Sequence, residues 1–398
     1  MPLRFLDAGE SHGPELTAVL EGLPAGIDVS PEDLDRDLAR RQRAYGAGPR
    51  MKLERDHGRI TAGVLEGRTT GGPVAVIVKN LDHARWAGRD LAPMTVPRPG
   101  HADLTGSLKY RHPDLRYALE RASARETAAR VCVGALCRAY LRAFSIEIGG
   151  YTVSLGEAEI PLEPCSPEDY RGRFARAMAS ELACPEPLYE DKLRDEVSQC
   201  VRARDTLGGV CEVVALGLPP GLGSHVHWDR RLDGRVAQAV LSIQAMKGVE
   251  VGPAFANARL RGTQVQDPLY LRDGRVARTS NRAGGLEGGV TTGEPLVVRC
   301  AMKPLSSTLT PLPSVDLLSG ESAPTVYERS DFSALPRAVP VCEAALALVL
   351  ADALLEKLGG DSIAEQRPRF EALLRGSLGE LPLRGTPWRF GYEPEEPR

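Results

Sequence analysis

Residues 123–144, SARETAARVCVGALCRAYLRAF, form the stretch that constrains the fold most strongly. Ser123 is followed three residues later by Glu126, which is the spacing of a capping box at the start of a helix. Apolar and small residues such as VCVGALC then continue without proline. The stretch therefore predicts a long helix from Ser123 to about Phe144.

Related signals recur on both sides of this helix. Ser30-Pro31-Glu32-Asp33 supplies an N-cap, a proline at the first helical position and acids in the first turn, and residues 166–169 repeat that chemistry. We expect further helices at 229–246 and 337–358. Apolar or alternating runs predict strands at 14–22, 59–65, 73–79, 146–155, 209–218 and 295–302. Loops are expected at 80–102 and 280–293.

This order of elements indicates a fold class. Neighbouring strand pairs occur together with strand–helix alternation, and the pattern appears about twice, once in each half of the chain. Such a mixture favours an α+β fold over a doubly wound parallel sheet. We expect one domain over residues 1–383, followed by a proline-rich tail at 384–398 that is flexible or makes an assembly contact.

Composition excludes some classes of protein. The net charge is −3, from 50 basic and 53 acidic residues, which does not suggest a nucleic-acid or membrane-surface protein. No uninterrupted run of 18 apolar residues predicts a membrane span, and no secretory signal is expected. The eight cysteines have no metal-ligand spacing, so we expect reduced thiols, no metal site and a cytoplasmic location.

Short polar stretches contain the residues suited to chemistry. Among seven histidines, only His12 in AGESHG (8–13) and His101 in RPGHAD (98–103) lie in glycine-containing turns with polar neighbours. Histidine titrates near neutrality and can donate a proton to a leaving group, although a hydrogen-bonded structural role is the alternative. Ser11 lies beside His12, but no GxSxG elbow is present, so a hydrolase nucleophile is not expected.

Basic residues accompany these turns. RASARE (121–126) combines two arginines with a helix start, whose free N–H groups and dipole attract anions; an ordinary capped helix with solvated arginines is the alternative. A basic cluster surrounds Tyr45-Gly46-Ala47-Gly48, and KPLSS (303–307) offers an ammonium and two hydroxyls. Neither a P-loop nor a Rossmann fingerprint is present. These features indicate an enzyme for a polyanionic, phosphorylated and carboxylated small molecule.

Several longer motifs together resemble one known family. GESHG, RRQ…YGAGPRM, RPGHAD, ERASARETAARV, DTLGG, IQAMKGVEVG, SNRAGGLEGG, KPLSS and RSDFSALPR stand in the order seen in chorismate synthases. The resemblance covers the chain from about Arg4 to Leu374. It implies a β-α-β sandwich with helices between antiparallel sheets, an internal pseudo-twofold and a homotetramer.

The resemblance also implies a reaction. The family converts 5-enolpyruvylshikimate 3-phosphate to chorismate by a 1,4-anti elimination of phosphate, the last shared step toward aromatic amino acids. The reaction requires reduced FMN although it has no net redox change. Some members reduce their own flavin with NADPH, but no nicotinamide fingerprint is seen here, so reduced FMN is expected from an external source.

Site roles follow by matching the family motifs. The resemblance implies that His12 assists the departure of phosphate, that His101 keeps the flavin in its useful protonation state, and that Asp331 serves as the base. The cofactor positions it implies are Arg121, Ala122, Ser123, Gln244, Ala245, Gly288, Lys303, Pro304, Leu305, Ser306, Ser307 and Arg329. The substrate positions it implies are Ser11, Arg41, Arg50 and Arg125.

One position departs from the family pattern. The family commonly has arginine where this chain has Ala47, and that position often contacts the anionic ligand. We expect Arg43 or Arg50 to compensate. A catalytically lapsed relative that binds FMN without turnover, and a basic RNA-binding module, are the alternative interpretations.

Overall fold

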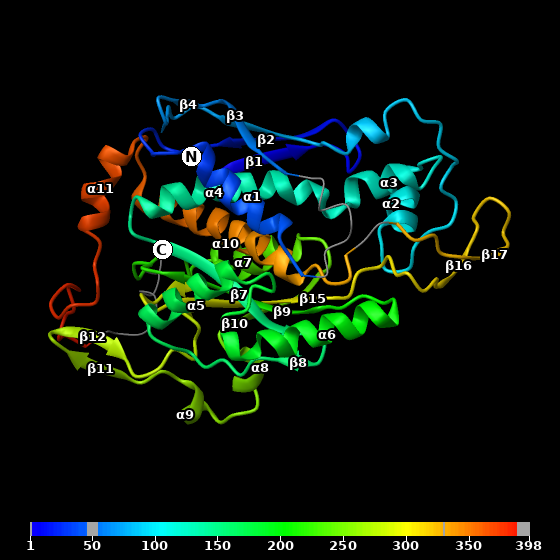
Figure 1. Cartoon of the computed structure of the whole chain (residues 1–398). Helices are drawn as coiled ribbons and strands as arrows, with labels where there is room; N and C mark the ends of the chain where they lie inside the picture. Colours follow the sequence, from blue (N-terminus) through cyan, green and yellow to red (C-terminus); the bar gives the residue numbers. More distant parts are fainter. Residues whose placement is uncertain (1, 46–54, 329–330, 388–398) are drawn as a thin grey trace, which may run out of the picture.

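The computed structural model describes residues 2–45, 55–328 and 331–387. Helices lie between two antiparallel sheets (Figure 1). The first sheet has the strand order β1 (Arg4–Ala8), β2 (Glu15–Glu21), β6 (Val74–Lys79) and β3 (Gly58–Ala62). The second has the order β10 (Met246–Val251), β15 (Leu296–Met302), β9 (Gly209–Leu216), β7 (Glu147–Leu155) and β8 (Ala158–Glu159). The α+β sandwich expected from the sequence is confirmed.

The central layer contains the main core helices, which are α1 (Pro31–Gln42), α4 (Thr127–Arg142), α7 (Leu232–Leu241) and α10 (Leu335–Leu358). Helix α4 packs on β2 and β6, while α10 packs on α4 and on β7 and β9. By length and composition α10 could cross a membrane, but 78% of its most apolar window is buried inside the fold. Each sheet thus covers one of two long helices, which is how the twofold repetition in the sequence is expressed.

Smaller elements extend this sandwich. Helices α5 (Pro167–Ala179) and α6 (Glu190–Ala203) pack on β7 of the second sheet. One end of the molecule in Figure 1 carries α2 (Asp103–Tyr110), α3 (Arg116–Ala122), β16 (Pro313–Val315) and β17 (Ser322–Pro324). The other end carries β11 (Leu269–Arg272), β12 (Arg275–Arg278) and α11 (Ile363–Glu371). The remaining short elements are β4 (Val64–Leu65), β5 (Arg68–Thr69), α8 (Ala254–Asn257), α9 (Gly262–Val265), β13 (Leu286–Glu287), β14 (Val290–Thr291) and the 3-10 turns η2 (His83–Arg85), η3 (Ala124–Glu126), η4 (Pro187–Tyr189) and η5 (Trp228–Arg230).

Of the two helix starts predicted at Ser30 and at Ser123, the first forms in the structure as expected and the second does not. Ser30 and Asp33 form the reciprocal capping box of α1. The capping box predicted for Ser123 and Glu126 is wrong, because the Ser123 hydroxyl accepts from the backbone N–H of Arg125 and opens the 3-10 turn η3 instead. The Glu126 carboxylate is bound by other side chains of the fold, so α4 begins only at Thr127.

Helices α4 and α10 cross in close contact at one glycine. A Cβ atom added to Gly134 would lie 2.2 Å from the Cβ of Ala344, so no larger residue fits there without displacement. Beside this point, the fully buried carboxylate of Glu343 accepts from Arg40 of α1 at 2.6 Å and from Arg138 of α4 at 2.6 Å. Burial raises the pKa of Glu343, but the two guanidinium groups outweigh it and hold that pKa below its usual value.

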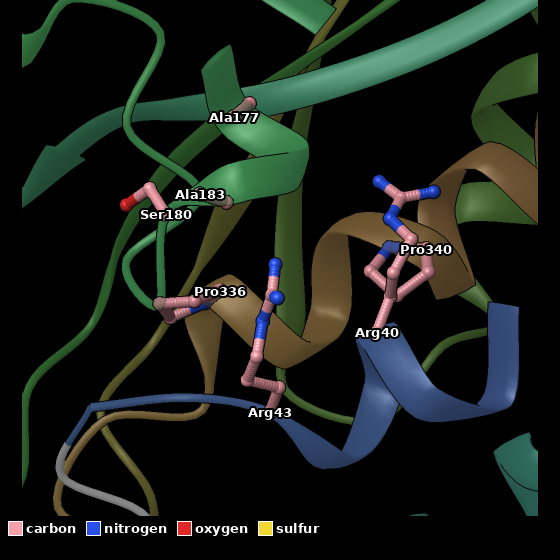
Figure 2. Close-up of a pocket in the computed structure, with 7 residues that line it drawn as sticks. All are labelled: Arg40, Arg43, Ala177, Ser180, Ala183, Pro336 and Pro340. Atoms are coloured by element: carbon pink, nitrogen blue, oxygen red, sulfur yellow. The ribbon is translucent and has the colours of Figure 1, made fainter. Parts of the chain in front are cut away.

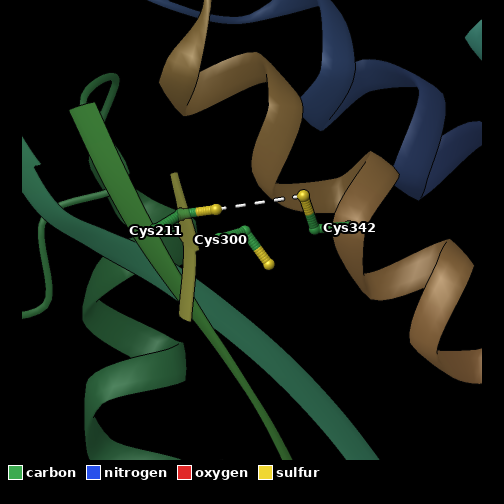
Figure 3. Close-up of side chains that lie close together, drawn as sticks. All are labelled: Cys211, Cys300 and Cys342. Atoms are coloured by element: carbon green, nitrogen blue, oxygen red, sulfur yellow. Dashed lines mark hydrogen bonds between the residues drawn. The ribbon is translucent and has the colours of Figure 1, made fainter. Parts of the chain in front are cut away.

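Three thiols meet in the core below this crossing. Cys211 of β9 and Cys300 of β15 are paired across the sheet, and Cys342 of α10 faces them (Figure 3). The three sulfur atoms lie within 4.8 Å of one another, a grouping that the spacing of cysteines along the sequence did not predict. All three residues are fully buried, and hydrogen bonding among the thiols together with burial raises the pKa of Cys211 and Cys342. The hydrogen bonds from Cys211 and Cys342 instead lower the pKa of Cys300, so the three thiols differ in acidity.

A small cavity lies where α1 ends and α10 begins (Figure 2). Arg40, Arg43, Pro336 and Pro340 are among the residues that line it, and its volume is about 10 Å³. A cavity needs about 10–15 Å³ to hold one water molecule, so this one is too small for an organic ligand.

The crossing generates a stability prediction. Gly134→Ala should lower the free energy of unfolding by about 1–3 kcal/mol, because the added methyl group overpacks the contact with Ala344. Urea unfolding measures the change. Gly172→Ala is the matched control, since a Cβ there meets only the flexible end of Arg176. The double variant G134A/A344G should recover part of the loss, and an unchanged stability of G134A would contradict the packing argument.

Candidate active site

A large cavity opens where the α3–α4 junction, the start of α10, the end of β15 and the loop after β6 converge. Its volume is about 510 Å³, within the range of pockets that hold small ligands. Five basic side chains line it, together with three carboxylates and apolar residues such as Leu119, Ile243, Met302 and Val341. This mixture suits a ligand with both a flat apolar part and several anionic groups.

Most residues singled out from the sequence gather in this cavity. The predicted positions that line it are Ser11, His12, Arg41, His101, Ala122, Ser123, Arg125, Gln244, Ala245, Lys303, Leu305, Ser306, Ser307 and Asp331. Arg121, Gly288 and Pro304 are not among its lining residues. The Arg121 guanidinium donates to the carboxylate of Asp7. Gly288 lies in the turn between β13 and β14, close to the side chain of His225. Arg50, Arg329 and Ala47 lie outside the described residues.

His12 is presented by a tight turn after β1. Gly9 has a φ of +125°, and a Cβ there would meet the carbonyl oxygen of Glu15 at 2.7 Å, so only glycine fits. The buried amide of Asn80 donates to the carbonyl oxygens of Ser11 and Gly13, both at 2.9 Å, and so holds the two sides of the turn together. The glycine-containing turn around His12 therefore has the close backbone packing that its sequence permits.

The His12 ring is held on two sides. Its Nδ1 lies 2.7 Å from Oε1 of Glu120, and the Glu120 Oε2 accepts the backbone N–H of His12 at 2.8 Å. The Trp86 ring packs against it with centroids 4.2 Å apart, and the Trp86 indole N–H donates to the buried carboxylate of Asp82. These contacts engage Nδ1, and the His12 side chain lines the cavity.

His101 belongs to a second buried network. Its Nδ1 contacts Asp103 at the start of α2, and the Arg98 guanidinium binds the same carboxylate at 2.8 and 3.0 Å. Burial raises the pKa of Asp103, but the bonds from His101 and Arg98 outweigh it and hold that pKa far below its usual value. Asp103 is therefore ionised, and it fixes His101 at the cavity wall.

The arginines of the cavity are anchored by the protein itself. Arg125 makes two bonds to the Asp56 carboxylate, at 2.7 and 2.9 Å, and is nearly fully buried. Arg41 donates to Thr127 at 2.9 Å and to the carbonyl of Ala124 at 2.8 Å. These contacts orient the guanidinium groups before any ligand binds. An anionic ligand would then add to the existing contacts of the two arginines.

Asp331 lies at the entrance to α10 and pairs with Arg337. Arg337 also donates to the carbonyl oxygen of Arg41 at 2.7 Å, which connects α10 to the end of α1. Both Asp331 and Arg337 line the cavity, with side chains that are mostly buried. The pairing holds the Asp331 carboxylate at the cavity wall.

The opposite wall carries polar groups suited to a cofactor. Lys303 donates to Ser306 at 3.0 Å and to the carbonyl of Gly100 at 3.1 Å, and burial together with Lys247 lowers the Lys303 pKa. The Gln244 amide nitrogen donates to Glu126 at 2.6 Å, which leaves its oxygen, Oε1, as an acceptor. In the part of the chain that the structure describes, this buried oxygen has no hydrogen-bond partner. It is thus suited to an N–H group of a bound ligand.

Several residues of the site were missed from the sequence. Trp86 lies in a stretch that was predicted only as a loop, and Arg98 and Arg337 stand inside quoted motifs without a role. Glu120 precedes RASARE, so its contact with His12 joins two segments 108 residues apart. The motifs marked the right segments, but no spacing in the sequence could identify which side chains would meet.

Comparisons with known proteins identify a family. A family model described as chorismate synthase matches residues 3–355. A chorismate synthase of Trichlorobacter lovleyi is 51% identical over 392 residues, covering 94% of this chain and 99% of the relative. One of Aquifex aeolicus is 50% identical, covering 93% of this chain and 96% of the relative.

A solved structure supports the same relationship. A crystal structure of a chorismate synthase matches with a TM-score of 0.77 and 44% sequence identity, covering 93% of this chain and 97% of that one. Sequence and fold therefore agree along almost the whole chain. The chain belongs to the chorismate synthase family, whose members are lyases.

Proposed function

We propose that this protein converts 5-enolpyruvylshikimate 3-phosphate to chorismate with the help of reduced FMN. The observation that carries the proposal is the gathering of His12, His101 and Asp331 around one cavity that also contains five basic side chains. The substrate has a phosphate and two carboxylates, and such a set of cations complements those charges. The product would serve as the last shared intermediate toward aromatic amino acids.

The residues present fit a flavin. The buried acceptor Oε1 of Gln244 suits a ring N–H, and the apolar lining from Ile243, Met302 and Leu305 suits a flat ring system. Ala122, Ser123, Lys303, Ser306 and Ser307 would complete the cofactor wall. Reduced FMN bound there would supply electron density transiently while the bond from carbon to the phosphate oxygen weakens.

Each catalytic residue has a task that its surroundings support. His12 would give a proton to the departing phosphate, with Arg41 and Arg125 holding the anionic groups of the substrate. Asp331 would act as the base for the ring proton, and its pair with Arg337 would hold the carboxylate at the cavity. His101, fixed by Asp103, would hold a proton near the cofactor ring. Burial of the site would strengthen all of these interactions.

Membership of the family also suggests an oligomeric state and a source of reduced flavin. We propose a cytoplasmic homotetramer that receives reduced FMN from a separate reductase. The outer face of the first sheet exposes Leu6 (65%) and Val19 (37%), which offers an apolar surface for assembly. Light scattering on the purified protein tests the tetramer.

An anaerobic assay tests the activity. Purified protein is mixed with chemically reduced FMN and 5-enolpyruvylshikimate 3-phosphate, and chorismate and phosphate are followed together. We expect equal release of both products, and no turnover with oxidised FMN and NADPH. If both ligands bind but no product forms, the chain is a lapsed relative, and Ala47→Arg becomes the first variant to make.

Variants of the three proposed catalytic residues should lose turnover while keeping the fold. His12→Ala, His101→Ala and Asp331→Ala are each expected to lower kcat by about 100-fold or more, because general acid–base catalysis contributes on that scale. FMN binding by D331A, followed by flavin fluorescence, should persist. His227→Ala removes an exposed histidine outside the cavity and is the control. Full activity of any of the three variants under saturating reduced FMN would remove that residue from the mechanism.

A further inference from the structure

Glu120, in the last turn of α3, makes an unusual double contact with His12. One carboxylate oxygen accepts the backbone N–H of His12 at 2.8 Å, and the other lies 2.7 Å from the ring Nδ1. Both side chains are mostly buried, with exposed fractions of 15% for His12 and 16% for Glu120. The neighbouring Ser11 donates its backbone N–H to the carbonyl of the same Glu120 at 3.1 Å. Glu120 therefore fixes both the turn and the ring.

The charge on Glu120 determines where the His12 proton resides. Burial raises the pKa of Glu120, but the hydrogen bonds from the His12 side chain and backbone outweigh it and lower that pKa below its usual value. An ionised carboxylate only accepts hydrogen bonds. The His12 Nδ1 must then carry a hydrogen in every protonation state that preserves this contact. The other ring nitrogen, Nε2, is not engaged by this contact, and the His12 side chain lines the cavity.

We propose that Glu120 is a positioning residue for His12, which keeps a proton on Nδ1 and presents Nε2 to the departing phosphate. The inference deepens the proposed function and rests on it. It adds a carboxylate that touches neither substrate nor cofactor to the roles that the family motifs imply.

This arrangement simplifies the proton transfer. Protonated His12 gives its Nε2 hydrogen to an oxygen of the leaving phosphate, and the N–H bond breaks as the O–H bond forms. The neutral ring that remains already has its hydrogen on Nδ1, bonded to Glu120. No ring flip or tautomer exchange is needed, and uptake of one proton at Nε2 restores the starting state. The packing of Trp86 on the ring at 4.2 Å opposes reorientation.

Glu120→Gln tests the proposal because glutamine has the same shape but only one accepting oxygen. That oxygen can satisfy the His12 backbone N–H, and the amide NH₂ then faces Nδ1 and forces the neutral ring to carry its hydrogen on Nε2. We expect kcat to fall by about 10- to 100-fold, by analogy with the loss of a carboxylate that orients a metal-binding histidine. The KM for substrate and the binding of FMN should change less than about 3-fold, because Glu120 lines no part of the cavity.

The chain offers a matched control on its surface. Asp35 bridges the Nδ1 of His57 at 2.9 Å and the backbone N–H of Gly58 at 3.0 Å, and His57 is 75% exposed. Asp35→Asn changes an equivalent carboxylate–histidine contact outside the cavity. It should leave kcat unchanged. If D35N loses as much activity as E120Q, the effect is a general loss of stability and the proposal is wrong.

Solid-state ¹⁵N spectra of protein labelled in its histidine rings supply a readout that does not depend on activity. The His12 signals are assigned by their loss in His12→Gln. At a pH where His12 is neutral, we expect a protonated Nδ1 in the wild type and a protonated Nε2 in E120Q. A wild-type spectrum with the hydrogen on Nε2 overturns the proposal even if E120Q does not fold. A wild type that shows the expected tautomer but makes no chorismate contradicts the proposed function and leaves the contact between Glu120 and His12 supported.

Discussion

The crossing of α4 and α10 at Gly134 and Ala344 is the constraint on which the rest of the structure depends. Close approach at this point brings the first turns of both helices to one place. The start of α4 follows Ser123 and Arg125, and the start of α10 follows Asp331, so their separation sets the width of the cavity. The buried Glu343, shared by Arg40 and Arg138, fixes α1 in the same arrangement. The steric contact between Gly134 and Ala344 and the ion pairs of Glu343 therefore both fix the relative positions of these helices.

Two arginines of the cavity are each paired with a buried carboxylate. Arg98 and Arg125 are both held by buried carboxylates, Asp103 and Asp56, and both arginines line the cavity. Breaking a buried pair by removing one partner costs about 3–5 kcal/mol, so these groups are effectively fixed in place. A ligand with several anionic groups meets oriented donors and spends little free energy on arranging them. Rigid pairing before binding is what allows a site with so many charges to remain ordered.

Local sequence predicted the parts of this molecule that local physics controls. The Ser-Pro-Glu-Asp start of α1, the strands β6 and β15 and the apolar run of α10 all form as expected, because caps and periodicity act over a few residues. The predicted capping box at Ser123 failed because Glu126 is bound by Arg130 and by the distant Gln244. Likewise the turns bearing His12 and His101 could be recognised, whereas the contact of Glu120 with His12 depends on tertiary packing. The motifs of the resemblance marked segments that line one cavity, whereas the contacts between their side chains could be seen only in the folded structure.

A crystal structure with FMN and 5-enolpyruvylshikimate 3-phosphate bound would test most directly whether the crossing of α4 and α10 assembles this active site. We expect the flavin ring against Gln244 and Ser307, and the phosphate within hydrogen-bonding distance of the His12 Nε2. A phosphate bound away from His12, or a flavin outside the cavity, would contradict this expectation.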